Sequence, residues 1–185
     1  MLSQRAPAAQ PAVRAVAESL PFPARSFDAA LAILTVHHWH DLAAGLQELR
    51  RVAQRQVVVT WDPRESSRLW LVDEYLPELI GYERQLDPFD SLRRGLHVEA
   101  IEPLAVPADC TDGFMAAYWR RPAAYLDPAV RASISGLSLL GQTLVEPAMA
   151  RLADDLETGA WHRRHQDLLD LDELDLGYKL VIAGG

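Results

Sequence analysis

Three histidines stand within a run of four residues, His37, His38 and His40, with Trp39 between the second and the third. The imidazole side chain gains and loses a proton near neutral pH, which suits it to proton transfer in catalysis. The run follows an apolar stretch, residues 29–36, that is typical of a strand covered on both faces in a parallel sheet. Because open parallel sheets bind ligands at the carboxyl ends of their strands, the run is the first candidate for a site.

Two other interpretations of the histidines stay open. His37 and His38 fit a structural role, with their rings hydrogen-bonded at a strand end. A metal site would draw on four side chains, His37, His40, His162 and His165. Adjacent side chains of an extended segment point apart, however, and the last two histidines also fit a solvated helix end near the negative pole of its dipole. We therefore assign no metal ligands.

A second group of reactive side chains follows residue 107. Tyr118 and Trp119 precede Arg120 and Arg121, and an arginine pair beside aromatic rings can bind a carboxylate or stack on a planar substrate. The other interpretation is a tight turn and a helix that packs its aromatic rings inward. Cys110 lies nearby, but its sequence neighbours supply no base that would stabilise a thiolate.

Several common site motifs are absent from the sequence. None of the ten glycines has the G-x-G spacing, so the chain carries neither a dinucleotide fingerprint nor a phosphate-binding loop. It has no G-x-S-x-G elbow, which disfavours a standard α/β-hydrolase. Cys110 is the single cysteine, and this excludes an intrachain disulfide and a cysteine-based zinc site.

Length and composition bound the remaining classes. A chain of 185 residues suits one domain with elaborations, and 49% hydrophobic residues can form a core. The 26 acidic residues outnumber the 18 basic ones for a net charge of -8, which disfavours nucleic acid and anionic membranes as partners. No apolar run approaches the length of a membrane span or of a signal peptide, so we expect a cytoplasmic protein.

The apolar pattern predicts a βαβ unit near the start of the chain. Its strands are residues 29–36 and 56–61, and Asp41 caps the helix between them, in which Leu42, Leu46 and Leu49 share one face. Other predicted strands are residues 13–17, 98–106 and 177–183. Predicted helices cover residues 65–80, 86–96, 112–125 and 128–145, followed by one with Pro147 in its first turn and Gly159 beyond its end.

Residues 17–62 carry a more specific pattern. It comprises AESLPFP at 17–23, SFDAA at 26–30, VHHW at 36–39, then Asp41, Leu46, Glu48, Arg51 and Val52. This pattern resembles the middle of a class I S-adenosylmethionine-dependent methyltransferase of the small-molecule kind known as methyltransferase type 11. Over residues 63–185 the resemblance is weaker, a helical substrate cap followed by two terminal strands.

The resemblance implies a Rossmann-like α/β fold. The family sheet has the strand order 3-2-1-4-5-7-6, and the cofactor lies over the carboxyl ends of strands one, two and four. On this template residues 13–17, 29–36 and 56–61 are strands three, four and five. We expect an incomplete sheet, strands three to seven, in a single domain over residues 1–185. Residues 64–97 and 108–170 are then mainly helical cap segments inserted into it.

The resemblance also implies a reaction and a site. The family moves a methyl group from S-adenosylmethionine to a small-molecule acceptor. Ala17 and Glu18 would flank the adenine, and Val36, His37 and His38 would line the methionine and substrate side. His37 or His38 would take a proton from an acceptor hydroxyl. The expected substrate contacts are Tyr75, Tyr118, Trp119 and Arg120. One departure is Val16, at a position where the family often has an acid or a polar group.

A larger departure concerns what the sequence does not contain. The family's first strand with its glycine-rich turn, and the second strand with its ribose-binding acid, have no counterpart here. We expect a truncated methyltransferase, with Met1 an internal methionine, that binds S-adenosylmethionine weakly and has little or no activity as an isolated chain. We also expect a homodimer that covers the edge strand at residues 29–36. The alternative is a non-catalytic or cofactor-free dimeric binding module. The methyl acceptor is not set by the sequence.

Overall fold

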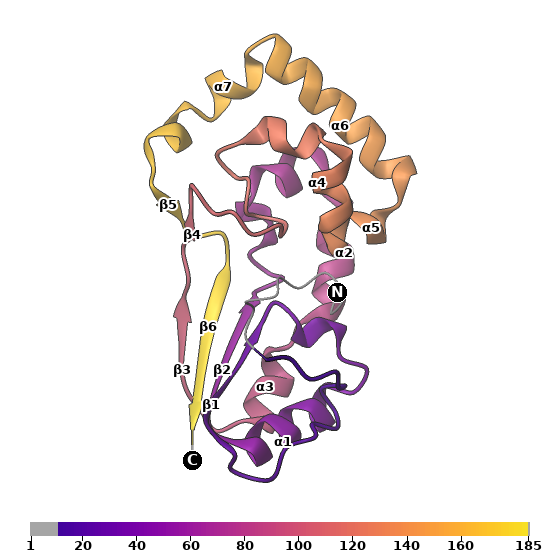
Figure 1. Ribbon diagram of the computed structural model, residues 1–185. Helices are drawn as coiled ribbons and strands as arrows, with labels where there is room; N and C mark the ends of the chain where they lie inside the picture. Colours follow the sequence, from indigo (N-terminus) through magenta and orange to yellow (C-terminus); the bar gives the residue numbers. More distant parts are fainter. Residues whose placement is uncertain (1–10, 185) are drawn as a thin grey trace. The chain divides into compact units, whose positions relative to one another are not determined.

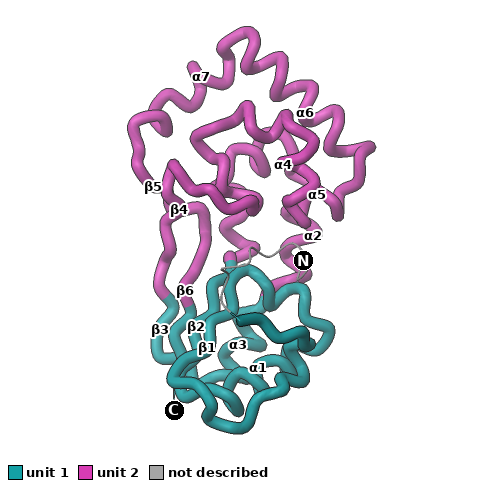
Figure 2. The backbone as a smooth tube through the Cα atoms, viewed as in Figure 1, with its two compact units in different colours: residues 1–60, 88–101, 181–185 teal, residues 61–87, 102–180 magenta. Residues whose placement is uncertain are grey.

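The computed structural model describes residues 11–184. Contacts divide the chain into two compact units, residues 1–60, 88–101 and 181–185 in the first and residues 61–87 and 102–180 in the second (Figure 2). The first unit holds the βαβ segment and the histidine run. The second holds most of the helices.

Four strands form one sheet in the order β1-β2-β6-β3 (Figure 1). They are β1 (Phe27–Ile33), β2 (Ala53–Trp61), β6 (Tyr178–Gly184) and β3 (Val98–Pro103). This order is the 4-5-7-6 part of the arrangement that the resemblance implied, and it confirms the α/β fold class. β1 and β2 are parallel, with Phe27 opposite Ala53 and Ile33 opposite Val59.

The predicted βαβ unit is confirmed, and its helix is α1 (Leu42–Val52). Asp41 caps the helix, because its side chain accepts a hydrogen bond of 3.0 Å from the backbone N–H of Ala44. The apolar face of α1 packs with α3 (Phe89–Gly95) against one face of the sheet. Leu46 of α1 and Leu92 of α3 are fully buried in this core.

A charged pair attaches the segment before β1 to α1. Arg51 donates to Glu48 at 2.6 Å and to the carbonyl groups of Phe22 at 2.7 Å and Leu20 at 2.9 Å. Glu48 in turn accepts from the N–H of Leu20 at 2.7 Å. The hydrogen bond from Arg51 and the one from Leu20 lower the pKa of Glu48 to about 2. Glu48 and Arg51 of α1 thus satisfy backbone groups that, within residues 11–184, lie outside every strand.

The expectation that residues 29–36 would be covered on both faces is wrong. Ala32 of β1 lies in the core, but Phe27 is 43%, Leu31 60% and Ile33 53% exposed. The reason is that α1 and α3 pack on one side of the sheet, so alternate residues of β1 face away from them. An apolar run therefore indicates that a strand can be buried, but it does not indicate whether helices cover one face of the sheet or both.

The predicted strand at residues 13–17 is also wrong. The segment makes a single bridge, between Val16 and Ser19, and Val13 and Val16 are 58% and 61% exposed. A short extended segment needs a neighbouring strand to be stable, and within residues 11–184 no strand runs beside this one. The observed sheet therefore corresponds to strands four to seven of the template, not three to seven.

The second unit is built from short helices, turns and a two-stranded sheet in which β4 and β5 pair antiparallel. In chain order its elements are the 3-10 turn Ser66–Arg68, the π-helix Leu71–Tyr75, α2 (Glu78–Glu83), the 3-10 turn Arg84–Leu86, β4 (Val106–Pro107), the 3-10 turn Pro122–Leu126, α4 (Pro128–Ser133), α5 (Ser135–Leu140), α6 (Gln142–Glu157), α7 (Ala160–Arg164), the 3-10 turn Gln166–Asp170 and β5 (Glu173–Leu174). The predicted long helices at residues 65–80, 112–125 and 128–145 are therefore broken into shorter pieces.

Two further details differ from the sequence-based expectation. α6 begins at Gln142, so Pro147 lies inside the helix and not in its first turn. Gly159 does follow the helix, with a φ of 71° that favours glycine. α3 belongs to the first unit, whereas the sequence placed all of residues 64–97 in the cap.

The contact between α1 and α3 generates the first prediction. A Cβ added at Gly95 would lie 2.7 Å from Leu46 Cδ1 and 3.1 Å from Leu46 Cβ, so the Gly95→Ala variant must displace a fully buried leucine. We expect Gly95→Ala to lower the free energy of unfolding by about 1–3 kcal/mol in urea titrations.

Gly81 is the matched control because it lies within α2 and a Cβ added there meets nothing within 4 Å. The Gly81→Ala variant should stabilise the chain by about 0.5–1 kcal/mol, since alanine restricts the unfolded state and favours helix. Equal shifts in the two variants would contradict the close approach of the two helices.

Candidate functional site

The histidine run lies where the sequence placed it, immediately after β1. Val36, His37 and His38 form a 3-10 turn, in which Val36 is buried and the two imidazole rings are 3.8 Å apart between centroids. His38 is exposed and His37 is partly buried. The turn thus presents one ring to solvent and holds the other against the unit.

Burial changes the acid-base behaviour of His37. Loss of hydration, and then the charge of His38, lower the pKa of His37 to about 4. The ring is consequently neutral at physiological pH and can accept a proton or a hydrogen bond. As a base it is weaker than an ordinary histidine, because its conjugate acid is poorly solvated.

The turn that contains Ala17 and Glu18 lies next to the histidine run. Glu18 Oε1 accepts a hydrogen bond of 3.0 Å from the backbone N–H of Asp41. This bond lowers the pKa of Glu18, and the charge of His40 contributes to the same shift. Ala17 and Glu18 are both partly buried. The structure therefore brings together the two segments that the resemblance assigned to the cofactor.

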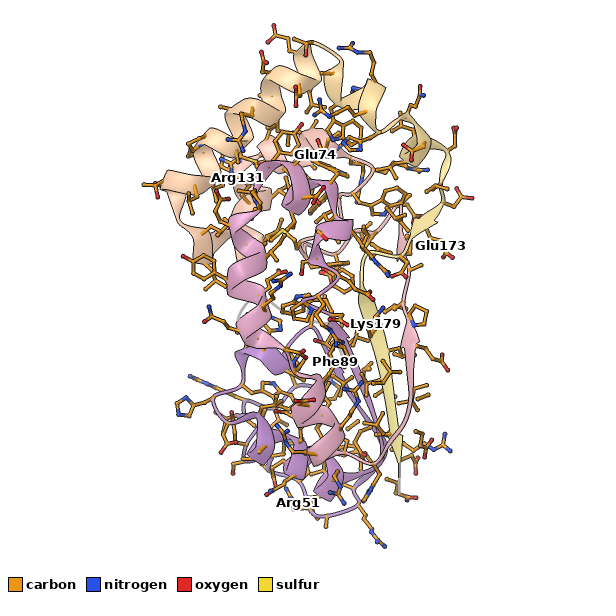
Figure 3. The ribbon with its side chains drawn as sticks, turned by 180° about the vertical axis from the view of Figure 1, so that it is seen from behind. Arg51, Glu74, Phe89, Arg131, Glu173 and Lys179 are labelled. Carbon is orange, nitrogen blue, oxygen red and sulfur yellow. The ribbon has the colours of Figure 1, made fainter. Side chains whose placement is uncertain are left out.

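The four predicted substrate residues all lie in the second unit. Tyr75 is buried and ends the π-helix, a helix type that often marks functional sites. Its hydroxyl donates to Asp155 at 2.6 Å and accepts from Arg164 at 2.8 Å. Arg164 also pairs with Glu74, labelled in Figure 3, at 3.1 Å. Burial, followed by the hydrogen bond to Asp155, raises the pKa of Tyr75.

Both arginines of the segment around residue 118 make contacts within the second unit. Arg121 lies over the ring of Tyr118, at 5.0 Å from the centroid. Arg120 donates to the carbonyl of Leu171 at 2.7 Å. Trp119 is fully buried and its indole N–H donates to the carbonyl of Val106 at 3.0 Å. Tyr118 and Arg120 remain partly exposed, and their role as substrate contacts stays a prediction.

A buried carboxyl group in the second unit was missed by sequence reasoning. Glu83 is 8% exposed and accepts a hydrogen bond from the hydroxyl of Ser66, while Trp61 bonds to it as well. Burial is the largest effect and raises the pKa of Glu83. Trp61 is the last residue of β2, so the carboxyl group lies at the carboxyl end of a parallel strand. Nothing in the surrounding sequence, Tyr82 to Arg84, distinguishes Glu83 from a surface residue.

An ion pair and a close backbone contact attach the segment after β2 to the start of β6. Lys179, the single lysine of the sequence, lies on β6 (Figure 3) and binds Glu65 at 2.7 Å. Gly177 has a φ of 84°, and a Cβ there would lie 2.8 Å from Glu65 Cβ. The backbone N–H of Asp62 donates to the carbonyl of Gly177 at 2.8 Å. Only glycine permits this close approach.

A pocket of about 290 Å³ lies in the second unit between α4, α5 and α6. Arg131 and Glu146, paired at 3.1 Å, line it together with apolar side chains such as Leu137 and Val145. None of the predicted substrate residues lines this pocket.

In the part of the chain that the structure describes, no three His, Cys, Asp or Glu side chains gather in a metal-binding group. Among the helices of residues 11–184, none combines the length and apolar character that crossing a bilayer requires.

Comparisons with known proteins point in one direction. Residues 1–59 match a family model described as a methyltransferase domain. The chain is 47% identical over 82 residues to the uncharacterized protein YafE of Escherichia coli (strain K12), a match that spans 44% of this chain and 35% of that relative. A putative methyltransferase from an antibiotic biosynthesis pathway of Anabaena variabilis ATCC 29413 is 36% identical. Its crystal structure matches with a TM-score of 0.80 over 91% of this chain and 71% of that chain.

The second prediction concerns the titration of His37. Nuclear magnetic resonance of the ring protons should give a pKa of about 4 for His37. In a His38→Gln variant the value should rise only in part, because burial is the larger cause and the neighbouring charge the smaller. An ordinary value near 6.5 in the parent chain would show that the ring is solvated.

The third prediction concerns Glu83. Its pKa in the folded state lies above its ordinary value of 4.5, so the folded and unfolded states are equally protonated below that pH. As the pH rises through the folded pKa, stability is lost, because the unfolded chain ionises more readily. Urea titrations at rising pH should therefore show a decline that the neutral variant Glu83→Gln lacks. The exposed Glu102 gives the control, since Glu102→Gln leaves Glu83 in place and should still show the decline. Parallel curves for the parent and Glu83→Gln would contradict the buried carboxyl.

Proposed function

Because the chain belongs to the class I S-adenosylmethionine-dependent methyltransferases, we propose that it contributes to methyl transfer onto an oxygen, nitrogen or carbon atom of a small molecule. The observation that carries the proposal is the position of His37 after the carboxyl end of β1, four residues before Asp41, whose backbone N–H binds Glu18. A small-molecule acceptor is also consistent with the antibiotic pathway named for the Anabaena protein. The alignment with YafE spans about a third of that relative, so activity and acceptor remain proposals.

The residues present fit one side of an S-adenosylmethionine site. Ala17 and Glu18 form a partly buried turn that can flank a planar base, and His37 offers a neutral ring at the end of β1. The carboxylate of Glu18 is already engaged by Asp41. Glycine-rich backbone for the methionine part would need a G-x-G spacing that this sequence does not contain. We therefore propose weak cofactor binding by the isolated chain.

The chain's own contribution to the reaction is orientation and proton acceptance. When bound, the cofactor supplies a sulfonium-activated methyl group, and an acceptor held in line with it needs little further activation. The neutral ring of His37 would accept the hydrogen bond or the proton of an acceptor hydroxyl. His38, exposed and in contact with His37, would pass the proton to solvent.

The four residues proposed to contact the acceptor fall into a partly exposed pair and a buried pair. Tyr118 and Arg120 are partly exposed and can touch a substrate. Tyr75 and Trp119 are buried, with their polar atoms already hydrogen-bonded, so they would support the substrate surface from within the second unit.

A second candidate function is a non-catalytic module derived from the same fold. It is favoured by the missing G-x-G spacing and by the exposed apolar side chains of β1. Such a module would keep the architecture without binding the cofactor.

Photolabelling with radioactive S-adenosylmethionine, followed by peptide mapping, is the fourth prediction and separates the two functions. We expect weak labelling confined to residues 17–18 and 36–38 and competed by S-adenosylhomocysteine. A His37→Ala variant should lose most of the label, whereas the control His162→Ala, in the second unit, should retain it. No competed labelling would support the cofactor-free module.

Calorimetry on the same chain tests the strength of binding. The dissociation constant for S-adenosylhomocysteine should lie well above the micromolar range, because the contacts of a glycine-rich turn are missing and each lost hydrogen bond contributes about 1 kcal/mol. Micromolar or tighter binding would contradict the proposal that this chain supplies only part of the site.

A further inference from the structure

The pocket between α4, α5 and α6 has both apolar and charged side chains in its lining. It measures about 290 Å³, and all of its lining residues belong to the second unit. Leu137 and Val145 are buried and contribute apolar surface, whereas Arg131, Glu146 and Gln142 contribute polar groups. A concave site with apolar walls and a few polar groups is typical of small-molecule binding.

Arg131 is held in a fixed position beside the pocket (Figure 3). Its Nη1 donates to the carbonyl groups of Tyr125 at 3.0 Å and Leu126 at 2.7 Å, and its Nη2 donates to Glu146 at 3.1 Å. The side chain is 12% exposed. Because these bonds already restrict the guanidinium group, it loses little conformational entropy when it binds a ligand.

The same guanidinium group keeps two donors for a ligand. Its Nε–H and the second hydrogen of Nη2 bond to nothing within residues 11–184. A largely buried donor without a partner costs free energy, so an acceptor at this position would be stabilising. A carboxylate suits neighbouring guanidinium nitrogens best, because its two oxygens can accept from both of them.

Glu146 places a negative charge directly beside Arg131. Its Oε1 accepts the hydrogen bond from Arg131, while its Oε2 has no partner in the described part of the chain. A ligand with only a carboxylate would be repelled by Glu146 at close range, whereas a positive group on the ligand would be attracted. Since the two protein charges are 3.1 Å apart, the two charges of the ligand must be neighbours as well.

We propose that this pocket binds a free α-amino acid with an aliphatic side chain. The carboxylate binds Arg131, the ammonium group binds Glu146, and the side chain packs against Leu137 and Val145. In an α-amino acid a single carbon atom separates the two charged groups, which matches the adjacent charges of the protein. The end of a peptide carries only one of the two charges at that spacing and fits less well.

The size of the pocket agrees with such a ligand. A water molecule occupies about 30 Å³ in the liquid, so the pocket has room for about ten non-hydrogen atoms, which is about the size of leucine. The proposal goes beyond methyl transfer and does not rest on it, because no residue proposed for the cofactor or the acceptor lines the pocket.

Titration of the parent chain with L-leucine, followed by nuclear magnetic resonance of the backbone amides, tests the site. We expect saturable shifts concentrated in residues 129–146. Two analogues of leucine each lack one charge: 4-methylpentanoate lacks the ammonium group and leucinamide lacks the carboxylate. Each should bind about ten-fold or more weakly than leucine, because it leaves one protein charge unmatched. Equal affinity of either analogue, shifts concentrated elsewhere or no saturable shift would overturn the proposal.

A substitution at Glu146 tests how the ligand is oriented. Arg131 also bonds to two backbone carbonyl groups, whereas the side chain of Glu146 is 58% exposed, so Glu146→Gln should leave the fold intact. The variant should bind leucine about ten-fold more weakly and should lose the preference for leucine over 4-methylpentanoate. Glu157→Gln is the matched control, because Glu157 is exposed on the same helix and lies outside the pocket lining. An unchanged preference in Glu146→Gln, or an equal loss in Glu157→Gln, would contradict the assignment of the ammonium group to Glu146.

Discussion

The parallel pairing of β1 with β2 around α1 is the constraint on which the first unit depends. The connection must return along one face of the sheet, and α1 does so with Leu46 and Leu49 buried against both strands. The same geometry places the chain after β1 at the carboxyl edge of the sheet, where His37 lies. Arg51 of α1 binds Glu48 and also the carbonyl group of Phe22, so it attaches the segment before β1 to the helix that follows β1.

Elements that depend on local signals could be predicted from the sequence, and those that depend on neighbours could not. The helix α1 is eleven residues long, and its position follows from local signals. These are the N-cap Asp41 and the spacing of Leu42, Leu46 and Leu49. The strand at residues 13–17 failed because its stability depends on a neighbouring strand, which sequence periodicity does not report. Gly141, with a φ of 72°, separates α5 from α6, and this moved the start of α6 ahead of Pro147. The helix tolerates Pro147 in its interior, a position that propensity disfavours.

The candidate site divides in the same way. The position of His37 follows from the strand before it, whereas its lowered pKa follows from burial, which depends on the packed unit. Tyr75 was selected for its type, yet its partners Asp155 and Arg164 are 80 and 89 residues away in the chain. Glu83 carries no sequence signal because its burial results from the packing of the second unit, in which Ser66 and Trp61 bond to it. Residue types indicate which side chains can transfer protons, but the pKa values and hydrogen-bond partners of these side chains depend on contacts formed in the folded unit.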